Sequence, residues 1–587
     1  SQKNNPPLIA LVEGYCGASD RPPTLMVGSD SISTSVLEGL RVNKVCTLSV
    51  ATERDIHAAK SMSAGYGCDH GPTLTFDEVG LKPCDPPLKI LNALPIGPPP
   101  PDTECSNNTE NYFKRPPAIA SSPVQMHCRL AMEVPLSTSS DSTMILLQID
   151  TYIIHGNVLR TQSTLYPTTK SSIQGNPDVR TITAKIDCLL LRPLASFGNN
   201  GRFGRVKTIY HMGRPRPREV PMMDRNRALS MSQKLINSCK PTTTTTTAAA
   251  AAEKKTNTAT QIFDGTTCNK IDWESNSLWE IDDLVPACSI PPEYDNIRDN
   301  MFEEGDGQTI SYTYRKDNIC PLGYNPMKQV VCPRFIGWIS TYEPESLLST
   351  ENGGGGSGQP IAHISPYSFC IDVARGSKPM IAFAACPRSD EFDNSDDESD
   401  SETEKQRSRN NKKIESDGWK DAQRDAELTG VFCVNLVSQE MAWAMNASAA
   451  PLGKGLSEFQ LTRSDNGTQQ QQQEKERQRE GSAATTRRTI PTPVPAPHIN
   501  APYVAESPMF MECRYVKTVK IPDIHDNDSM YSLIIGEVVN IHVRKDVAMK
   551  RTADDGSEIM DIDIEKMKPV ARLGYGQEYT VVTTEIE

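Results

Sequence analysis

Residues 505–519 read AESPMFMECRYVKTV, and apolar residues alternate with polar ones along this stretch from Met509 onward. A period of two is typical of a β-strand with one buried face. The run YSLIIGEVVNIHV at 531–543 is rich in β-branched residues and predicts a second long strand. Shorter segments of this kind predict strands at 336–341, 380–386 and 431–437, and helix-forming residues predict helices at 420–428 and 439–447. The expected class is mainly β with a few helices, arranged as a barrel or sandwich with helical crossovers.

The stretch 505–514 has a counterpart early in the chain. ASSPVQMHCR at 120–129 matches AESPMFMECR at an offset of 385. ILLQIDTYIIH, which ends at His155, matches LIIGEVVNIH, which ends at His542, at an offset of 387. IDCLLLRPLASFG at 186–198 matches IDIEKMKPVARLG at 562–574 at an offset of 376. Three matches in one order at nearly one offset predict the duplication of a whole domain rather than a short-period repeat.

Low-complexity segments divide the chain. TTTTTTAAAAAEKK lies within 241–258, GGGGSG within 351–358, an acidic and then basic run within 387–417, and QQQQQEKERQRE with a Pro-rich end within 462–497. None has enough apolar surface to offset the entropy cost of ordering the backbone, about 1–2 kcal/mol per residue. We therefore expect an N-terminal barrel over 1–206, a linker over 207–325, and a C-terminal barrel over 326–587 that carries inserts at 387–417 and 462–497.

Composition excludes several classes of function. The net charge is −13 (61 Lys+Arg against 74 Asp+Glu), which argues against a nucleic-acid polymer or an anionic membrane as partner. The 16 cysteines include no Cys-x-x-Cys pair, which favours free thiols in a reducing, cytoplasmic compartment. The sequence begins with Ser1 rather than Met, so the possibility that a targeting segment has been removed stays open.

An ordered series of short motifs resembles a known family. The series is PRFIGWIST at 333–341, ISPYSF at 364–369, KD at 420–421, FCVNLV at 432–437, MNAS at 445–448, PLGKGLSEF at 451–459, VAESP at 504–508, GEV at 536–538 and PVARLG at 569–574. It is similar to the flavin reductase-like, FMN-binding split-barrel family, which includes flavoredoxins and the reductase partners of two-component monooxygenases. The earlier copy resembles the family more faintly, through RPPTLMVG at 21–28 and VCTLSV at 45–50. The motifs PRFIGWIST and ISPYSF have no counterpart before Arg21, so this copy is truncated or diverged at its start.

The resemblance implies a site for FMN in the later copy. A phosphate dianion needs hydroxyls, backbone N–H groups and a cation, and the flat flavin ring needs an apolar slot. The candidate cofactor-binding residues are Ser340, Thr341, Ser365, Pro366, Tyr367, Ser368, Phe369, Lys420, Asp421 and Arg572. No metal ligands and no specific catalytic residue are assigned, because hydride exchange is chemistry of the flavin itself. Family members pair as dimers, so we expect an intramolecular pseudodimer of the two barrels, or else a homodimer.

Two functions remain open from the sequence. The first is an FMN-binding oxidoreductase that uses NADH or NADPH to reduce flavin or another small electron acceptor. The second is a non-catalytic flavin-binding or scaffold protein that keeps the duplicated fold without turnover. Departures such as Ala422 after Lys-Asp favour the second, and the retained motifs favour the first. His363 and His542 are interpreted as strand histidines satisfied by the backbone, and Cys433 and Cys513 as core thiols.

Overall fold

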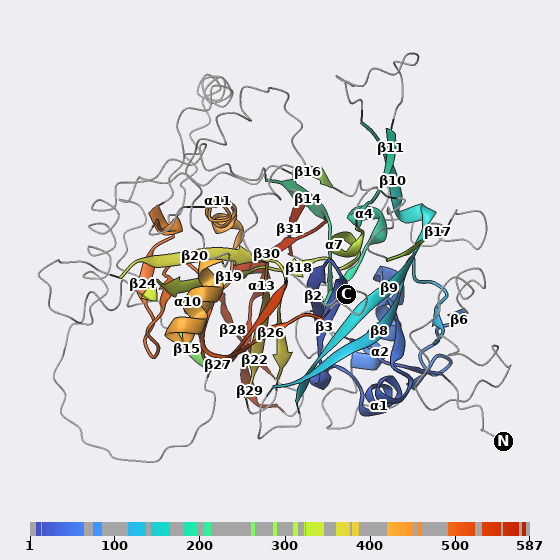
Figure 1. The fold of residues 1–587 in the computed structure, drawn as a ribbon, viewed down its shortest axis with the longest axis horizontal. Coiled ribbons are helices and arrows are strands. Elements are labelled where there is room, and N and C mark those ends of the chain that lie inside the picture. Colours follow the sequence, from blue (N-terminus) through green and yellow to red (C-terminus); the bar gives the residue numbers. More distant parts are fainter. Residues whose placement is uncertain are drawn as a thin grey trace, which may run out of the picture.

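The fold is seen in a computed structural model of the chain, drawn in Figure 1. It describes residues 7–12, 14–63, 74–84, 116–136, 142–164, 181–196, 203–212, 260–263, 286–289, 309–314, 322, 325–344, 360–375, 378–386, 420–450, 452, 456–460, 491–522, 531–552, 556–574 and 578–582. The low-complexity stretches predicted at 241–258, 351–358 and 387–417 lie outside these residues, as does most of the stretch predicted at 462–497, of which residues 491–497 are described.

The C-terminal half is built on an eight-stranded sheet with the order β20-β19-β23-β26-β27-β22-β21, to which β15 adds in parallel beside β27. Its elements are α7 (Met327–Val330), β18 (Arg334–Phe335), β19 (Gly337–Tyr342), β20 (Ala362–Tyr367), β21 (Cys370–Ala374), β22 (Met380–Ala385), α10 (Asp421–Thr429), β23 (Val431–Asn435), η7 (Gln439–Met441), α11 (Ala442–Ala447), η8 (Glu458–Gln460), β24 (Pro493–Pro495), β25 (Pro502–Val504), β26 (Met509–Lys520), β27 (Ser532–Arg544), η9 (Lys545–Val547), β28 (Ala548–Thr552), β29 (Glu558–Ile562), α13 (Ile564–Met567), β30 (Val570–Arg572) and β31 (Glu578–Val581). The strands and helices expected from periodicity are confirmed, and so is the mainly β class.

This sheet curls until its two ends meet. Tyr367 on β20 and Phe383 on β22 come from opposite ends of the strand order, yet their ring centroids are 4.8 Å apart. Phe432 on the inner strand β23 meets Phe383 edge to face, with centroids 5.5 Å apart. A Cβ added to Gly337 would lie 2.5 Å from Sγ of Cys370, so β19 can approach β21 this closely only because residue 337 is glycine. The sheet therefore closes as a barrel through packed side chains rather than through a complete ladder of hydrogen bonds.

The N-terminal half repeats the arrangement with a six-stranded sheet of order β2-β3-β9-β8-β4, with β17 beside β9. Its elements are β1 (Leu8–Ile9), β2 (Tyr15–Asp20), β3 (Pro23–Gly28), η1 (Ser29–Ser31), α1 (Thr34–Asn43), β4 (Val45–Ser49), η2 (Glu53–Asp55), α2 (Ile56–Ser63), β5 (Leu74–Thr75), β6 (Pro83–Cys84), β7 (Ala118–Ile119), β8 (Val124–Pro135), β9 (Thr143–His155), η4 (Gly156–Val158), β10 (Leu159–Thr164), β11 (Thr181–Ile186), α4 (Cys188–Leu191), β12 (Leu194–Ser196) and β13 (Phe203–Arg205). Over the described residues, β4 is the edge of this sheet, whereas its counterpart β23 continues to β19 and β20.

The two halves agree in local detail as well as in strand order. The hydroxyl of Ser122 donates to two backbone carbonyls, those of Val50 and Val124, and the hydroxyl of Ser507 donates to the equivalent pair. Arg192 and Lys568 end equivalent short helices in the left-handed conformation, with φ of 48° and 45°. A non-glycine residue in this conformation is uncommon, so its recurrence at the same place supports the structural correspondence of the two halves.

One detail of the sequence alignment is wrong. The amide of His155 donates to the carbonyl of Pro123, and the amide of Arg544 donates to the carbonyl of Pro508. His155 therefore corresponds to Arg544, an offset of 389 rather than 387, and His542 corresponds to Ile153. The sequence match placed the two strands two residues out of register. A shift of two keeps each side chain on the same face of the strand, so the apolar pattern hardly changes.

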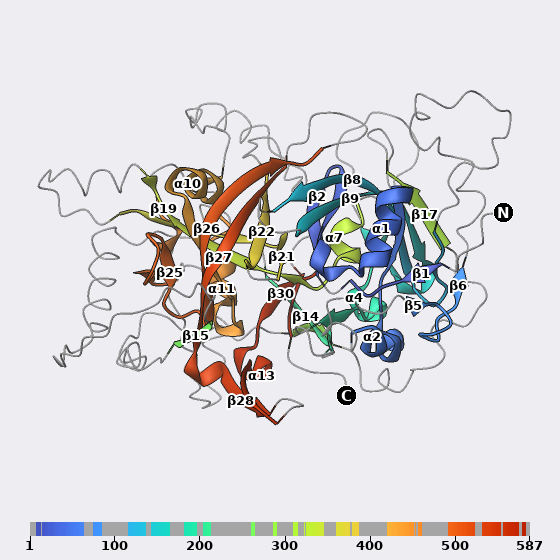
Figure 2. The ribbon, with the colours of Figure 1, turned by 90° about the horizontal axis from the view of Figure 1, so that it is seen from below.

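The halves pack face to face through an apolar cluster to which both contribute. Cys16, Ala18, Met26, Met144 and Leu146 of the first half lie in one buried core with Phe369, Val373, Met380, Ala382 and Leu533 of the second. The contact is reciprocal, because β2 meets β22 while β3 meets β21, the equivalent pair. A Cβ on Gly28 would lie only 2.5 Å from the carbonyl oxygen of Val373. Figure 2 shows the two sheets side by side, with β26 and β27 on one side and β8 and β9 on the other.

The segment predicted as a linker, 207–325, contains strands. They are β14 (Thr208–His211), β15 (Thr260–Phe263), β16 (Pro286–Ser289) and β17 (Thr309–Thr313). β17 pairs with β9 of the first half, whereas β14 pairs with β31 and β15 with β27 of the second. Likewise β24, inside the predicted insert 462–497, pairs with β25. Edge strands of this kind are short and weakly patterned, since they only need to satisfy backbone groups at a sheet margin.

Candidate functional site

The predicted flavin segment follows one strand into the boundary between the halves. Ser365, Pro366 and Tyr367 end β20, where they pair across the ladder with β19. Ser365, Pro366 and Ser368 are half-buried, whereas Tyr367 and Phe369 are buried. The segment is thus positioned by backbone pairing on one side and by core packing on the other.

Lys420 lies beside this segment. It is exposed, has extended backbone, and immediately precedes α10. Its Nζ lies 5.4 Å from the centroid of the Tyr367 ring, within the range of a cation–π contact. The next residue, Asp421, forms an ion pair with Arg424 at 3.5 Å, which balances its negative charge at the helix start. The structure therefore brings Tyr367, Lys420 and Asp421 together.

Ser340 and Thr341 are placed differently. Both are fully buried, with exposed fractions of 0%. The Ser340 hydroxyl donates to the carbonyl of Pro502 at 2.6 Å and accepts from Nδ2 of Asn435 at 2.8 Å. The Thr341 hydroxyl donates to Oδ2 of Asp425 at 2.9 Å. Both hydroxyls are occupied by partners within the protein.

Asp425 and His363 complete a buried polar group next to Thr341. Nδ1 of His363 lies 2.8 Å from Oδ2 of Asp425, so its partner is a carboxylate and the expectation of a backbone partner is wrong. Burial lowers the pKa of His363, but the hydrogen bond to Asp425 and the negative field of Glu458 outweigh it and raise the pKa to about 9. Burial also raises the pKa of Glu458 to about 7. Asp425 could not be singled out from the sequence, because its partners are 62 and 84 residues away.

Arg572 belongs to another sheet. It lies on β30 in the five-stranded order β16-β14-β31-β30-β18, and its guanidinium sits 4.7 Å from the centroid of the Tyr579 ring. Its backbone pairs with that of Arg334, whose buried guanidinium donates to the carbonyls of Val331, Leu573 and Gly574. Arg572 is therefore held on a different sheet from the one that carries Tyr367.

Residues of the first half complete the boundary. Sγ of Cys16 lies 3.6 Å from the carbonyl oxygen of Ser368, and a Cβ on Gly17 would lie 2.4 Å from the Phe369 ring. Asp20 binds Lys328 of α7 and the hydroxyl of Tyr531. These groups were missed from the sequence, since only the packing of one half on the other brings them near the candidate segment.

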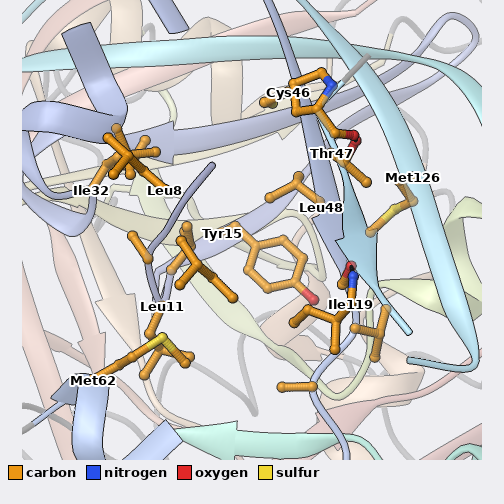
Figure 3. A pocket seen from close by; sticks show the side chains of 18 of the residues that line it. Leu8, Leu11, Tyr15, Ile32, Cys46, Thr47, Leu48, Met62, Ile119 and Met126 are labelled. Atoms are coloured by element: carbon orange, nitrogen blue, oxygen red, sulfur yellow. Dashed lines mark hydrogen bonds between the residues drawn. The ribbon is translucent and has the colours of Figure 1, made fainter. Parts of the chain in front are cut away.

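A cavity of about 890 Å³ lies in the N-terminal half, away from this segment (Figure 3). Its walls are mostly apolar and include Leu8, Leu11, Tyr15, Leu48 and Met126. Strand pairing explains the space. Phe432 and Phe383, which fill the C-terminal barrel, correspond to Cys46 and Val27, which both line the cavity. The cavity therefore occupies the space that the two phenyl rings fill in the C-terminal barrel, because Cys46 and Val27 are smaller side chains.

Cys433 and Cys513, expected as core thiols, are both fully buried. Burial raises the pKa of each thiol well above its usual value, so neither is a ready nucleophile. In the part of the chain that the structure describes, no helix is long and apolar enough to cross a bilayer.

Comparison with known proteins agrees with the motif series. Residues 419–557 match the model of the flavin reductase like domain. The chain carries a flavin reductase like domain. The matched residues include Lys420, Asp421 and all of β23, β26 and β27.

Sequence relatives include an uncharacterized protein of Deinococcus radiodurans, 24% identical over 257 residues, which are 44% of this chain and 79% of the relative. Another is an uncharacterized protein of Aquifex aeolicus, 22% identical over 274 residues, which are 47% of this chain and 91% of the relative. Among solved structures, nitrilotriacetate monooxygenase component B from Bacillus cereus is 20% identical with a TM-score of 0.28, covering 44% of this chain and 90% of that one. Flavoredoxin of Desulfovibrio vulgaris is 18% identical with a TM-score of 0.25, covering 43% and 90%.

Proposed function

We propose that the C-terminal half binds FMN beside Tyr367 and Lys420 and serves NAD(P)H-dependent reduction of flavin or of another small electron acceptor. The observation that carries the proposal is the exposed Lys420 at the start of α10, next to the Tyr367 ring and inside the segment that matches the flavin reductase like domain. The bound flavin would supply the hydride exchange, and the protein would bind and orient it.

The residues present suit a flavin phosphate in part. Lys420 supplies a cation, and the first turn of α10 presents backbone N–H groups toward its start, of which that of Gln423 already donates to the carbonyl of Lys420. The ion pair with Arg424 offsets the charge of Asp421, which would otherwise repel an anion. Pro366 and Tyr367 offer apolar surface for the ring system. We leave Ser340 and Thr341 out of the proposed contacts, because their hydroxyls are buried and already hydrogen-bonded.

The same two hydroxyls favour the alternative function. A site with fewer phosphate donors binds FMN less tightly, since a hydrogen bond to a charged group contributes about 1.5–3 kcal/mol. A non-catalytic flavin-binding or scaffold protein would tolerate that loss, whereas an enzyme that needs resident FMN would not. The burial of Ser340 and Thr341 is therefore the observation that favours this second function.

We also infer that the halves arose by duplication and pair within one chain. The repeated strand order, the repeated Ser122 and Ser507 hydrogen bonds, and the reciprocal packing of β2 and β3 on β22 and β21 support this inference. A reciprocal contact is the mark of a two-fold interface between like units. The candidate flavin segment then lies where a family dimer would place it, at the boundary between two barrels. A homodimer of whole chains is the alternative.

Titration of the full chain with FMN tests the proposal. Lys420→Ala should weaken FMN binding about 10- to 150-fold, the equivalent of losing one charge-assisted contact of about 1.5–3 kcal/mol. Lys550→Ala is the matched control, because Lys550 is an exposed lysine of the same half that pairs with Glu558 at 2.8 Å. Bleaching of bound flavin by NADH or NADPH would support the enzyme, and binding without bleaching would support the scaffold. Equal FMN affinity of the native chain and Lys420→Ala would overturn the proposed site.

A further inference from the structure

Two histidines and a glutamate from three separate segments meet under the β24–β25 hairpin. Ligand atoms of His498, Glu512 and His542 all lie within 4.8 Å of one another. Nδ1 of His498 is 3.0 Å from Oε2 of Glu512, and Nε2 of His542 is 3.5 Å from Oε1. Glu512 and His542 are on the paired strands β26 and β27, whereas His498 comes from the turn between β24 and β25. The three side chains therefore converge only in the folded C-terminal half.

The carboxylate is held firmly in place. Glu512 has an exposed fraction of 0%, and it accepts hydrogen bonds from the backbone N–H of His498 at 3.0 Å and from Nδ2 of Asn540 at 2.7 Å. A buried carboxylate needs a nearby positive charge, because desolvation of an unpaired charge is costly. Donors that fix a ligand's oxygen atoms are a regular feature of metal sites.

The histidines are oriented as well. The His542 ring stacks on Phe510 with centroids 4.3 Å apart, and the centroid of the His498 ring lies 5.8 Å from that of His542 at an interplanar angle of 20°. His542 is 2% exposed, and its Nε2 has no hydrogen-bond partner among the residues described. A buried imidazole nitrogen that faces a carboxylate oxygen at 3.5 Å, longer than an ordinary hydrogen bond, leaves its lone pair available to a metal ion shared with that oxygen.

We propose that His498, Glu512 and His542 form a binding site for a divalent transition-metal ion of the Zn²⁺ class. Ligands about 2.0–2.2 Å from tetrahedral Zn²⁺ are separated from one another by about 3.3–3.6 Å. The 3.5 Å contact falls within that spacing, the 3.0 Å contact is a few tenths of an ångström shorter, and all the ligand atoms lie within 4.8 Å of one another, so side-chain shifts can admit the ion. Two histidines and one carboxylate leave a coordination position for water. The side chain of His498 is 44% exposed and gives the ion a path from solvent.

The site belongs to the C-terminal half alone. By strand pairing, Glu512 corresponds to His127 and His542 to Ile153 in the first half. The bound ion would tie the Pro-rich β24–β25 hairpin, a separate two-stranded sheet at the end of the predicted insert, to β26 and β27. The proposed metal site thus assigns a role to the β24–β25 hairpin, which takes no part in the proposed flavin site.

Metal titration of the full chain tests the site. The protein would be stripped with EDTA, kept reduced, and titrated with Zn²⁺ and Co²⁺. Because thiolates are also ligands for these ions and the chain has 16 cysteines, the result is read from the comparison between variants. His498→Ala removes a half-exposed ligand with little effect on the core, and His57→Gln, at an exposed histidine of the other half, is the control.

The native chain and His57→Gln should each bind one more Co²⁺ per chain than His498→Ala, with a visible spectrum typical of nitrogen and oxygen ligands. Asn540→Ala leaves the three ligands in place and removes one of the two donors that position Glu512, so it should lower Zn²⁺ affinity about 10- to 100-fold. Zn²⁺ should raise the melting temperature of the native chain more than that of His498→Ala. Equal metal content and affinity of the native chain and His498→Ala, or Co²⁺ spectra of thiolate ligands only, would overturn the proposal.

Discussion

Removal of the His363 imidazole should change how stability depends on pH. His363 is 3% exposed and lies 2.8 Å from Asp425, and its pKa is raised to about 9 from 6.5. A raised pKa means that the folded state binds the proton more tightly, so the stabilisation is complete below pH 6.5 and is lost as the pH rises through 9. The difference of about 2.5 pKa units corresponds to about 3 kcal/mol, of which about 2.5 kcal/mol should disappear between pH 7 and 9.5.

The assay is guanidinium unfolding of the native chain and of His363→Gln at several pH values above 7. Glu458, with a pKa near 7, titrates mostly below this window. The free-energy difference between native and variant should shrink by about 2.5 kcal/mol as the pH rises from 7 to 9.5. His57→Gln, an exposed control, should show no such trend. A native-minus-variant difference that stays constant across the window would refute the idea that His363 is held protonated by Asp425.

Two further pairs of substitutions test the packing. Gly28→Ala should destabilise the chain by about 1–3 kcal/mol, because its Cβ would lie 2.5 Å from the backbone oxygen of Val373 in the other half. Gly39→Ala, in the interior of α1 with nothing within 4 Å, should instead stabilise it by about 0.5–1 kcal/mol, and chemical unfolding compares the two. Phe432→Ala should cost about 3–5 kcal/mol, whereas Cys46→Ala at the equivalent position beside the cavity should cost less than about 1 kcal/mol; equal losses would contradict the correspondence of the two barrels.

Periodicity in the sequence was enough to locate the long strands, and motif matches were enough to reveal the repeat. The strand predicted at 509–519 is β26, Met509–Lys520, and that at 531–543 is β27, Ser532–Arg544. The short strands at 260–263 and 309–313 were not predicted, because an edge strand is defined by its partner and has little pattern of its own.

The candidate site was harder to predict than the fold. Ser340 and Thr341 looked like hydroxyls at a strand end, but β19 continues to Tyr342, and both hydroxyls point to partners inside the protein. The deciding partner, Asp425, sits on α10 and is brought to Thr341 by tertiary packing alone. Motifs identify which segments form a site, whereas the direction of each side chain depends on neighbours that are remote in sequence.

The differences between the halves follow a physical rule. Features that set backbone geometry recur: the left-handed residues Arg192 and Lys568, the hydroxyls of Ser122 and Ser507, and the strand register that breaks twice along each long hairpin. Features that only fill space do not recur, because an interior side chain can be replaced without redirecting the chain. A barrel whose backbone is fixed in this way can lose two rings and keep its topology. That freedom allows the first half to act as a packing partner while the second keeps the residues proposed to hold flavin.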